Sequence, residues 1–132
     1  MPDQSAQAIV EQFIDAWNRM DFDAIVDALD CNVFYHNIPM APVEGLEAVR
    51  EYLRRAWRFD AVDWQTINIA CTGNTVLTER VDNFIINGGP VSLPVMGVFE
   101  VADDKITAWR DYFDLASYKA QLAAVAGNAD QA

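Results

Sequence analysis

The second half of the chain contains four consecutive segments that are rich in β-forming residues and separated by short turns. These segments are residues 62–71, 75–87, 91–102 and 105–114. The sequence NGGP at 87–90 and the sequence ADDK at 102–105 contain residue types that tight turns prefer. Strands joined by such turns pair with their neighbours along the chain, so this half predicts an antiparallel meander.

Other segments show the spacing of helices, with apolar residues every three or four positions. Ile9, Phe13 and Trp17 form such a stripe in the first of them, which Asp3 or Ser5 can cap. The predicted helices cover residues 5–19, 21–29, 46–57 and 115–126. A short strand over residues 31–37 lies between the second and third helices.

The order of these elements predicts the fold class. Helices gathered at the front, followed by long antiparallel segments, favour an α+β domain. We expect a curved mixed, mostly antiparallel sheet that packs against the N-terminal helices and forms a cone with an apolar pocket. The chain has 132 residues, which suits one domain over residues 1–132, with residues 127–132 expected to be a frayed tail.

The charge balance excludes several kinds of partner. The chain carries a formal net charge of −11, which repels phosphate backbones and anionic lipids, so we expect neither nucleic acid nor a membrane as a partner. No apolar run reaches the roughly 18 residues that span a bilayer, and the N-terminus lacks a signal-peptide pattern. These features predict a soluble cytoplasmic protein. Cys31 and Cys71 are expected to be semi-buried apolar residues, with no disulfide or zinc site.

The motifs of several enzyme classes are missing from the sequence. The chain has a single histidine, His36, and lacks HExxH, GxSxG, GxxxxGK[ST] and GxGxxG. Metal-dependent hydrolysis, serine hydrolysis and nucleotide-phosphate binding therefore lack their usual residues, and we expect no metal and no organic cofactor. Carboxylate chemistry or simple ligand binding remains.

Three charged residues occupy strand positions where an inward-facing side chain is expected. Arg80 and Asp82 share a strand face with Phe84, and Asp111 lies between two large aromatic residues on its own strand. A buried carboxylate is costly unless a cation pairs with it, and one guanidinium can serve two carboxylates. A surface salt bridge or a buried structural ion pair remains the alternative, because a shift of one residue turns every side chain to the other face.

A second group of polar side chains lies in the predicted strand over residues 31–37. Tyr35 and Asn37 share one face of this strand, and His36 points to the other. A hydroxyl and an amide can hold a water molecule without competing for its proton. Ordinary structural roles for Tyr35 and Asn37 also remain open, and we expect His36 to be structural or on the surface.

These polar residues have a definite chemical use if they converge on one pocket. Two carboxylates on one arginine cannot both ionise easily in a dry site, so one is expected to be an acid and the other a base. Such a pair suits the addition of water across an epoxide, because the base activates water and the acid protonates the departing oxygen.

Four segments resemble the limonene-1,2-epoxide hydrolase family, which has the NTF2-like cone fold, also called SnoaL-like or ketosteroid-isomerase-like. They are YHNIP at 35–39, TERVD at 78–82, GVF at 97–99 and KITAWRDYFDL at 105–115. The resemblance runs from about residue 5 to residue 118. ERVD and WRDYFDL are far more specific than the fold, which hosts many functions.

The resemblance implies a role for each of the five polar residues. Asp111 would be the general base that activates water, Tyr35 and Asn37 would hold that water, Asp82 would be the general acid, and Arg80 would bridge the carboxylates. The product would be a vicinal diol, formed in one step without a covalent intermediate by a homodimer. The substrate would be a small apolar epoxide resembling limonene-1,2-epoxide, cyclic or aliphatic. The residues expected to line the pocket are Phe84, Leu93, Val95 and Phe113.

Three other functions remain open at this point. The same cone fold carries isomerases of the ketosteroid-isomerase type and polyketide cyclases, although a fixed cation between carboxylates suits them less than a neutral oxyanion hole does. It also carries binding domains without catalytic activity. An epoxide hydrolase that forms an aspartyl ester would need a histidine for its second step, and His36 faces away from the other polar residues.

Overall fold

Helices and strands follow one another across residues 5–130, the part of the chain that the computed structural model describes. They are α1 (Ala6–Asn18), α2 (Phe22–Asp27), β1 (Leu29–Asn37), β2 (Val43–Glu44), α3 (Leu46–Ala56), β3 (Ala61–Thr72), β4 (Thr75–Ile86), β5 (Gly89–Ala102), β6 (Lys105–Tyr112) and α4 (Leu115–Asp130). The predicted elements all occur within a few residues of their expected ends, and β2 is an addition that the sequence patterns did not indicate.

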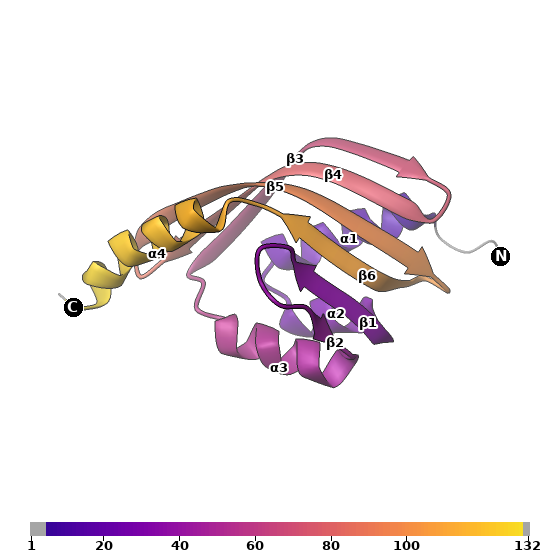
Figure 1. Ribbon diagram of the computed structural model, residues 1–132, viewed down its shortest axis with the longest axis horizontal. Helices are drawn as coiled ribbons and strands as arrows, with labels where there is room; N and C mark the ends of the chain where they lie inside the picture. The colour runs from indigo at the N-terminus through magenta and orange to yellow at the C-terminus, as the bar shows by residue number, and fades with distance from the viewer. Residues whose placement is uncertain (1–4, 131–132) are drawn as a thin grey trace.

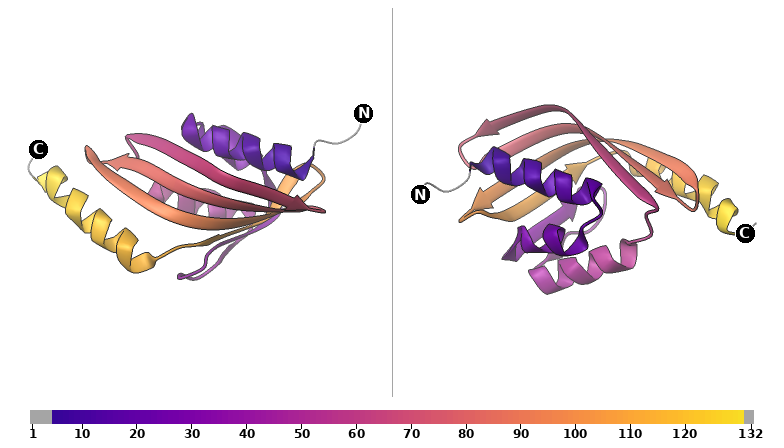
Figure 2. Two further views of the ribbon diagram at one scale, coloured as in Figure 1. Left: turned by 90° about the horizontal axis from the view of Figure 1, so that it is seen from above. Right: turned by 180° about the vertical axis from the view of Figure 1, so that it is seen from behind.

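The six strands form one sheet in the order β2-β1-β6-β5-β4-β3. Neighbouring strands are antiparallel except β1 and β6, which are parallel. The long strands β3 to β6 curve together, and α1 lies across one face of them with α2 and α3 beside it (Figures 1 and 2). The α+β class and the curved, mixed and mostly antiparallel sheet are therefore confirmed.

The hydrophobic core lies between α1 and the inner face of the sheet. Buried and exposed residues alternate along β5, so one face of that strand is covered and the other is open. Phe13 of α1 packs edge-on against Phe99 of β5 and Trp109 of β6, with ring centroids 5.8 and 5.0 Å apart. The helical stripe predicted at Ile9, Phe13 and Trp17 is buried in this core.

Local capping explains where two helices begin. The Ser5 side chain accepts a hydrogen bond from the Ala8 N–H and so caps α1, while Asp3 lies outside the described residues. The Asp21 side chain caps α2 by accepting from the Ala24 N–H. Both caps satisfy backbone donors that have no partner within the helix.

Both predicted turns have backbone conformations that explain their residues. Asn87 and Gly88 have φ angles of 52° and 76°, and Asp103 and Asp104 have 51° and 61°. Two consecutive positive φ angles suit a hairpin turn whose twist matches that of the strands, and Asn and Asp tolerate this region better than other non-glycine residues. The turns hold β4, β5 and β6 in one meander.

The C-terminal region departs from the prediction. The last strand ends at Tyr112 instead of residue 114, because the Asp114 side chain accepts from the Ala116 and Ser117 N–H groups and begins α4. The helix then continues to Asp130, so the frayed tail expected from residue 127 is helical as far as the structure describes it. Residues 131 and 132 lie outside the described residues.

Two surface properties complete the description of the fold. Cys31 and Cys71 are both exposed, so the prediction that they are semi-buried was wrong. Cys71 lies near the end of the edge strand β3, and its side chain is exposed there. Within residues 5–130, none of the helices is long and apolar enough to cross a membrane.

Candidate active site

Arg80 stands between Asp82 and Asp111 inside the molecule. Its Nε and Nη2 donate to the two oxygens of Asp82 at 2.9 and 2.8 Å, and Nη2 also donates to Asp111 Oδ2 at 3.2 Å. Arg80 and Asp82 are two residues apart on β4 and share its inner face, while Asp111 reaches them from β6. The side chains of Arg80, Asp82 and Asp111 are 0%, 5% and 7% exposed. The predicted convergence of the three residues is thus present in the structure.

Gly97 makes this bridge possible, because β5 lies between β4 and β6. Gly97 pairs with Thr78 on one side and with Asp111 on the other. A Cβ atom at Gly97 would overlap Nη1 of Arg80 and would lie 2.7 Å from Asp111 Oδ1 and 2.9 Å from Thr78 Oγ1. A glycine therefore leaves the space through which the guanidinium crosses β5. Sequence reasoning noticed the GVF segment but not this role.

The guanidinium is also held by uncharged neighbours. Its Nη1 donates to Thr78 Oγ1 at 3.0 Å, and Thr78 donates in turn to the Gly97 carbonyl at 3.2 Å. The ring of Trp64 lies 4.6 Å from the guanidinium carbon, and that of Phe99 lies 5.8 Å away. These contacts compensate the desolvation of a buried cation and fix its orientation.

Burial and neighbouring charges shift the pKa values of Asp82 and Arg80 in this site. Desolvation raises the pKa of Asp82 to about 6, against the lowering effect of Arg80, and the charge of Asp111 adds to the rise. The pKa of Arg80 is raised despite the opposing effect of its burial, because Asp111 and Asp82 outweigh it. Arg80 is therefore a permanent cation, and Asp82 can hold a proton at mildly acidic pH.

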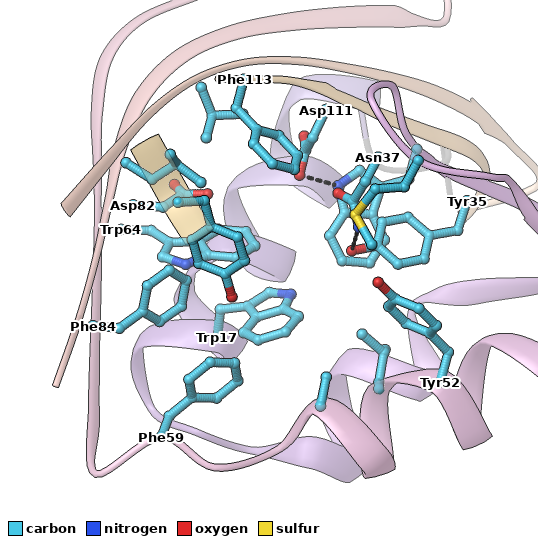
Figure 3. Close-up of a pocket in the computed structure, with 17 residues that line it drawn as sticks. Trp17, Tyr35, Asn37, Tyr52, Phe59, Trp64, Asp82, Phe84, Asp111 and Phe113 are labelled. Atoms are coloured by element: carbon cyan, nitrogen blue, oxygen red, sulfur yellow. Dashed lines mark hydrogen bonds between the residues drawn. The ribbon is translucent and has the colours of Figure 1, made fainter. Parts of the chain in front are cut away.

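The parallel pairing of β1 with β6 brings Tyr35 and Asn37 to Asp111. Asn37 is the register partner of Asp111, and Tyr35 is that of Trp109. The rings of Tyr35 and Trp109 stack with centroids 4.0 Å apart, and Asn37 Nδ2 donates to the Tyr35 hydroxyl at 2.9 Å (Figure 3). Burial, together with the charge of Asp111, raises the pKa of Tyr35 well above its usual value, so Tyr35 stays a neutral phenol.

The carboxylate of Asp111 has one partnered and one unpartnered oxygen. Its Oδ2 accepts from Arg80 and, at 3.1 Å, from the indole N–H of Trp109. Its Oδ1 is buried without a hydrogen-bond partner among residues 5–130. The same holds for the indole N–H groups of Trp17 and Trp64, and each unsatisfied buried group costs roughly 1–3 kcal/mol.

These residues border a cavity of about 120 Å³ on the inner side of the sheet (Figure 3). All four residues predicted to line the pocket do so, namely Phe84, Leu93, Val95 and Phe113. Asp82, Asp111, Tyr35 and Asn37 also reach the cavity, whereas Arg80 lies behind the two carboxylates. The volume is well below the roughly 300–1,000 Å³ of pockets for drug-sized ligands, which favours a compact substrate.

Sequence reasoning missed several residues of the pocket wall. Trp17, Tyr52, Trp64 and Tyr118 all line the cavity. Trp17 was recognised only as part of a buried helical stripe, and periodicity cannot distinguish a packed core from the wall of a cavity. Tyr52 lies next to the buried Leu53 on α3. A tyrosine beside a buried helix position was the one feature of the sequence that could have indicated a pocket residue here.

Three polar residues within the segments YHNIP and KITAWRDYFDL lie apart from the cavity wall. The His36 ring pairs with the Met40 carbonyl at 2.8 Å, as expected for a structural or surface histidine. Arg110 forms an ion pair with Glu100, and Asp114 caps α4. None of the three is among the residues that line the cavity in the described part of the chain. The geometry therefore gives no support to a mechanism in which a histidine activates the water that hydrolyses an aspartyl ester.

The comparison with protein families matches nearly the whole chain. A family model described as the limonene-1,2-epoxide hydrolase catalytic domain matches residues 4–123. The epoxide hydrolase EphG of Mycobacterium tuberculosis is 39% identical over 106 residues, which cover 80% of this chain and 71% of EphG.

Solved structures show the same fold. The structure of an LEH-like epoxide hydrolase from M. tuberculosis is similar with a TM-score of 0.78 and 35% identity, covering 92% of this chain and 94% of that one. A SnoaL-like polyketide cyclase from Shewanella denitrificans, described as putative, has a TM-score of 0.79 at 14% identity, covering 90% and 97% of the two chains. The second likeness concerns the fold alone, so the fold by itself does not distinguish a hydrolase from a cyclase.

Proposed function

This chain belongs to the limonene-1,2-epoxide hydrolase family and is an epoxide hydrolase of that type, and we propose that it adds water to a small apolar cyclic or aliphatic epoxide to give a vicinal diol. The observation that carries the proposal is the bridge from Arg80 to Asp82 and Asp111 at the wall of an apolar cavity. It supplies an acid and a base that share one cation, with no need for another reactive group.

The reaction begins with a water molecule beside Asp111. Asp111 accepts a proton from this water while the water oxygen attacks an epoxide carbon. Tyr35 and Asn37 are close enough to Asp111 to orient the water, since Asn37 is its register partner and Tyr35 is hydrogen-bonded to Asn37. Holding the nucleophile in place removes much of the entropic cost of the attack.

The carbon–oxygen bond of the epoxide breaks as the new bond forms. Asp82 donates its proton to the departing oxygen, which becomes the second hydroxyl of the diol. The raised pKa of Asp82, about 6, supports this role because a carboxyl at its ordinary value would be ionised. Arg80 stabilises each carboxylate whenever it is charged, and the proton gained by Asp111 balances the one lost by Asp82.

The test is turnover of limonene-1,2-epoxide and cyclohexene oxide by the parent protein and by Asp111→Asn. We expect diol from the parent and a loss of at least about 100-fold in the variant, which retains the shape of the side chain but not the base. Asp63→Asn is the matched control, because Asp63 is an exposed strand aspartate outside the site. Equal diol formation by the parent and Asp111→Asn would exclude Asp111 as the base.

An isotope measurement distinguishes the one-step route from a covalent one. A single turnover in H₂¹⁸O with excess protein should place ¹⁸O in the diol and leave the aspartates unlabelled. An aspartyl ester would put ¹⁸O into Asp82 or Asp111 on hydrolysis, which peptide mass spectrometry detects.

We further propose that the protein is a homodimer that associates through the outer face of the sheet. Ile67, Met96 and Tyr112 expose 57%, 50% and 46% of their surface, and they border one shallow hollow on that face. An apolar surface of this kind is typical of a protein interface. Light scattering should give twice the mass of the chain, and Met96→Glu should reduce it to the monomer.

A further inference from the structure

The pocket contains two hydroxyl groups that the proposed reaction does not use. Tyr52 of α3 and Tyr118 of α4 both line the cavity. Figure 3 shows the hydroxyl of Tyr52 turned into the cavity, on the side of Tyr35. The rings of Tyr35 and Tyr52 meet edge-on with centroids 5.7 Å apart, and Tyr118 packs edge-on against the lining residue Phe113 at 6.0 Å.

Both hydroxyls are available to a ligand. Tyr52 and Tyr118 are half-buried, and neither hydroxyl forms a hydrogen bond with any residue between 5 and 130. Burial raises the pKa of Tyr118, the charge of Arg58 opposes the rise, and Tyr52 adds to it. Tyr118 is therefore a neutral hydrogen-bond donor at physiological pH.

Their surroundings indicate what these donors can bind. Apolar and aromatic side chains form most of the wall, so a hydrocarbon that fills the cavity would remove water from two hydroxyls and return no hydrogen bond. An oxygen acceptor would restore one. A carboxylate is disfavoured, because Asp82 and Asp111 border the same cavity and the whole chain has a net charge of −11.

We propose that Tyr52 and Tyr118 form a polar subsite that binds a neutral oxygen of the substrate, so the preferred substrate is a compact epoxide with a second oxygen function, such as a ketone, ether or alcohol, away from the epoxide ring. This inference rests on the proposed hydrolase function and narrows its substrate class. The tyrosines act in substrate recognition, while Asp82 and Asp111 carry out the chemistry.

A pair of substrates of nearly equal shape tests the subsite. Limonene-1,2-epoxide carries an isopropenyl group, and 4-acetyl-1-methylcyclohexene 1,2-epoxide replaces its terminal CH₂ by a carbonyl oxygen. The measured quantity is the ratio of kcat/KM for the ketone to kcat/KM for the alkene. Using this ratio cancels effects that a variant has on both substrates alike.

The ratio should favour the ketone in the parent and fall by about fivefold to tenfold in Tyr52→Phe or Tyr118→Phe, as expected for one lost hydrogen bond. Each variant removes a single oxygen atom. The control Thr72→Val removes the hydroxyl of an exposed residue at the end of β3, outside the cavity and the proposed dimer surface, and should leave the ratio unchanged. Binding of the two corresponding cyclohexanes without the epoxide, measured by calorimetry, should show the same preference independently of turnover.

The outcomes separate this inference from the function on which it rests. Turnover of the alkene epoxide with a ratio that neither pocket variant changes would overturn the subsite and leave the hydrolase function intact. Absence of diol from both epoxides would contradict the hydrolase function, and equal binding of the two cyclohexanes would then overturn the subsite as well. A ratio that falls only in a pocket variant would support the subsite.

Discussion

An arginine bridges two aspartates at two places within residues 5–130, once on the surface and once inside. On the surface, Arg19 donates to Asp15 at 2.9 Å and to Asp21 at 3.0 Å. These three side chains are 53%, 66% and 42% exposed. Water screens each of the charges, so this cluster resembles an ordinary surface ion pair that contributes little to stability.

The cluster around Arg80 has the same composition and similar distances, but it is closed to water. Asp82 and Asp111 approach Arg80 at 2.8 and 3.2 Å with side chains that are almost fully buried. Desolvation then acts on every charge and raises the pKa of Asp82. The comparison teaches that burial, and not the identity of the three residues, raises the pKa of a carboxyl that is paired with an arginine.

Removal of each arginine gives the largest contrast between the two clusters. Arg80→Ala should lower kcat/KM by roughly 1,000-fold or more, because both carboxylates lose their shared cation. It should also destabilise the fold by about 3–5 kcal/mol, since two buried carboxylates are left unpaired. Arg19→Ala should change neither quantity measurably. Epoxide turnover and urea unfolding measure both effects, and similar behaviour of the two variants would refute the contrast.

Gly97→Ala breaks the buried cluster without removing a charge. The added methyl group would overlap the Arg80 guanidinium and displace it from Asp111. We expect kcat/KM to fall by about 100-fold, because misplacement by about 1 Å is enough to cost that much. Gly127→Ala is the matched control, since an added Cβ there meets nothing within 4 Å. Retention of full activity in Gly97→Ala would show that the bridge tolerates crowding.

The stability of the two clusters should also depend differently on pH. The pKa of Asp82 is raised by folding from about 3.9 to about 6, so the folded state binds this proton more tightly than the unfolded state. The resulting stabilisation is complete below pH 4 and is lost as the pH rises through 6, a decrease of about 3 kcal/mol. Asp82→Asn should lack this decrease, whereas Asp15→Asn should retain it. Denaturant unfolding between pH 4 and 7 measures the difference, and parallel curves for the parent and Asp82→Asn would contradict it.

Salt should produce the smallest effect. Ions screen charges that are open to solvent, and at about 1 M salt the screening length is near 3 Å. Any stabilisation by the Arg19 cluster should vanish under these conditions, while the cost of Arg80→Ala should persist. A salt-dependent cost of Arg80→Ala in denaturant unfolding would mean that solvent reaches the buried cluster.

The sequence predicted the fold and most of the candidate site because both leave local patterns. Arg80, Asp82 and Asp111 interrupt strands that are otherwise apolar on their inner faces, and such interruptions can be recognised from the sequence alone. The turns at 87–90 and 102–105 carry residues that tolerate positive φ angles, so the meander was predictable as well.

Features that depend on distant contacts were not predictable in this way. The role of Gly97 requires knowing that β5 separates β4 from β6, and the environment of Tyr118 requires knowing where α4 packs. The end of α4 was misjudged because Gly127 and Asn128 are typical helix-ending residues, and yet the helix continues through both.

The protonation of Asp82 is the most direct test of the contrast between the two clusters. A titration of the carboxyl carbons by ¹³C NMR, with Asp82 assigned through Asp82→Asn, would follow Asp82 together with Asp15 and Asp21. We predict that the Asp82 carboxyl titrates at about 6. Titration of Asp82 near 3.9, the ordinary value for an aspartate, would contradict the account, because burial would then have produced no acid for the epoxide oxygen.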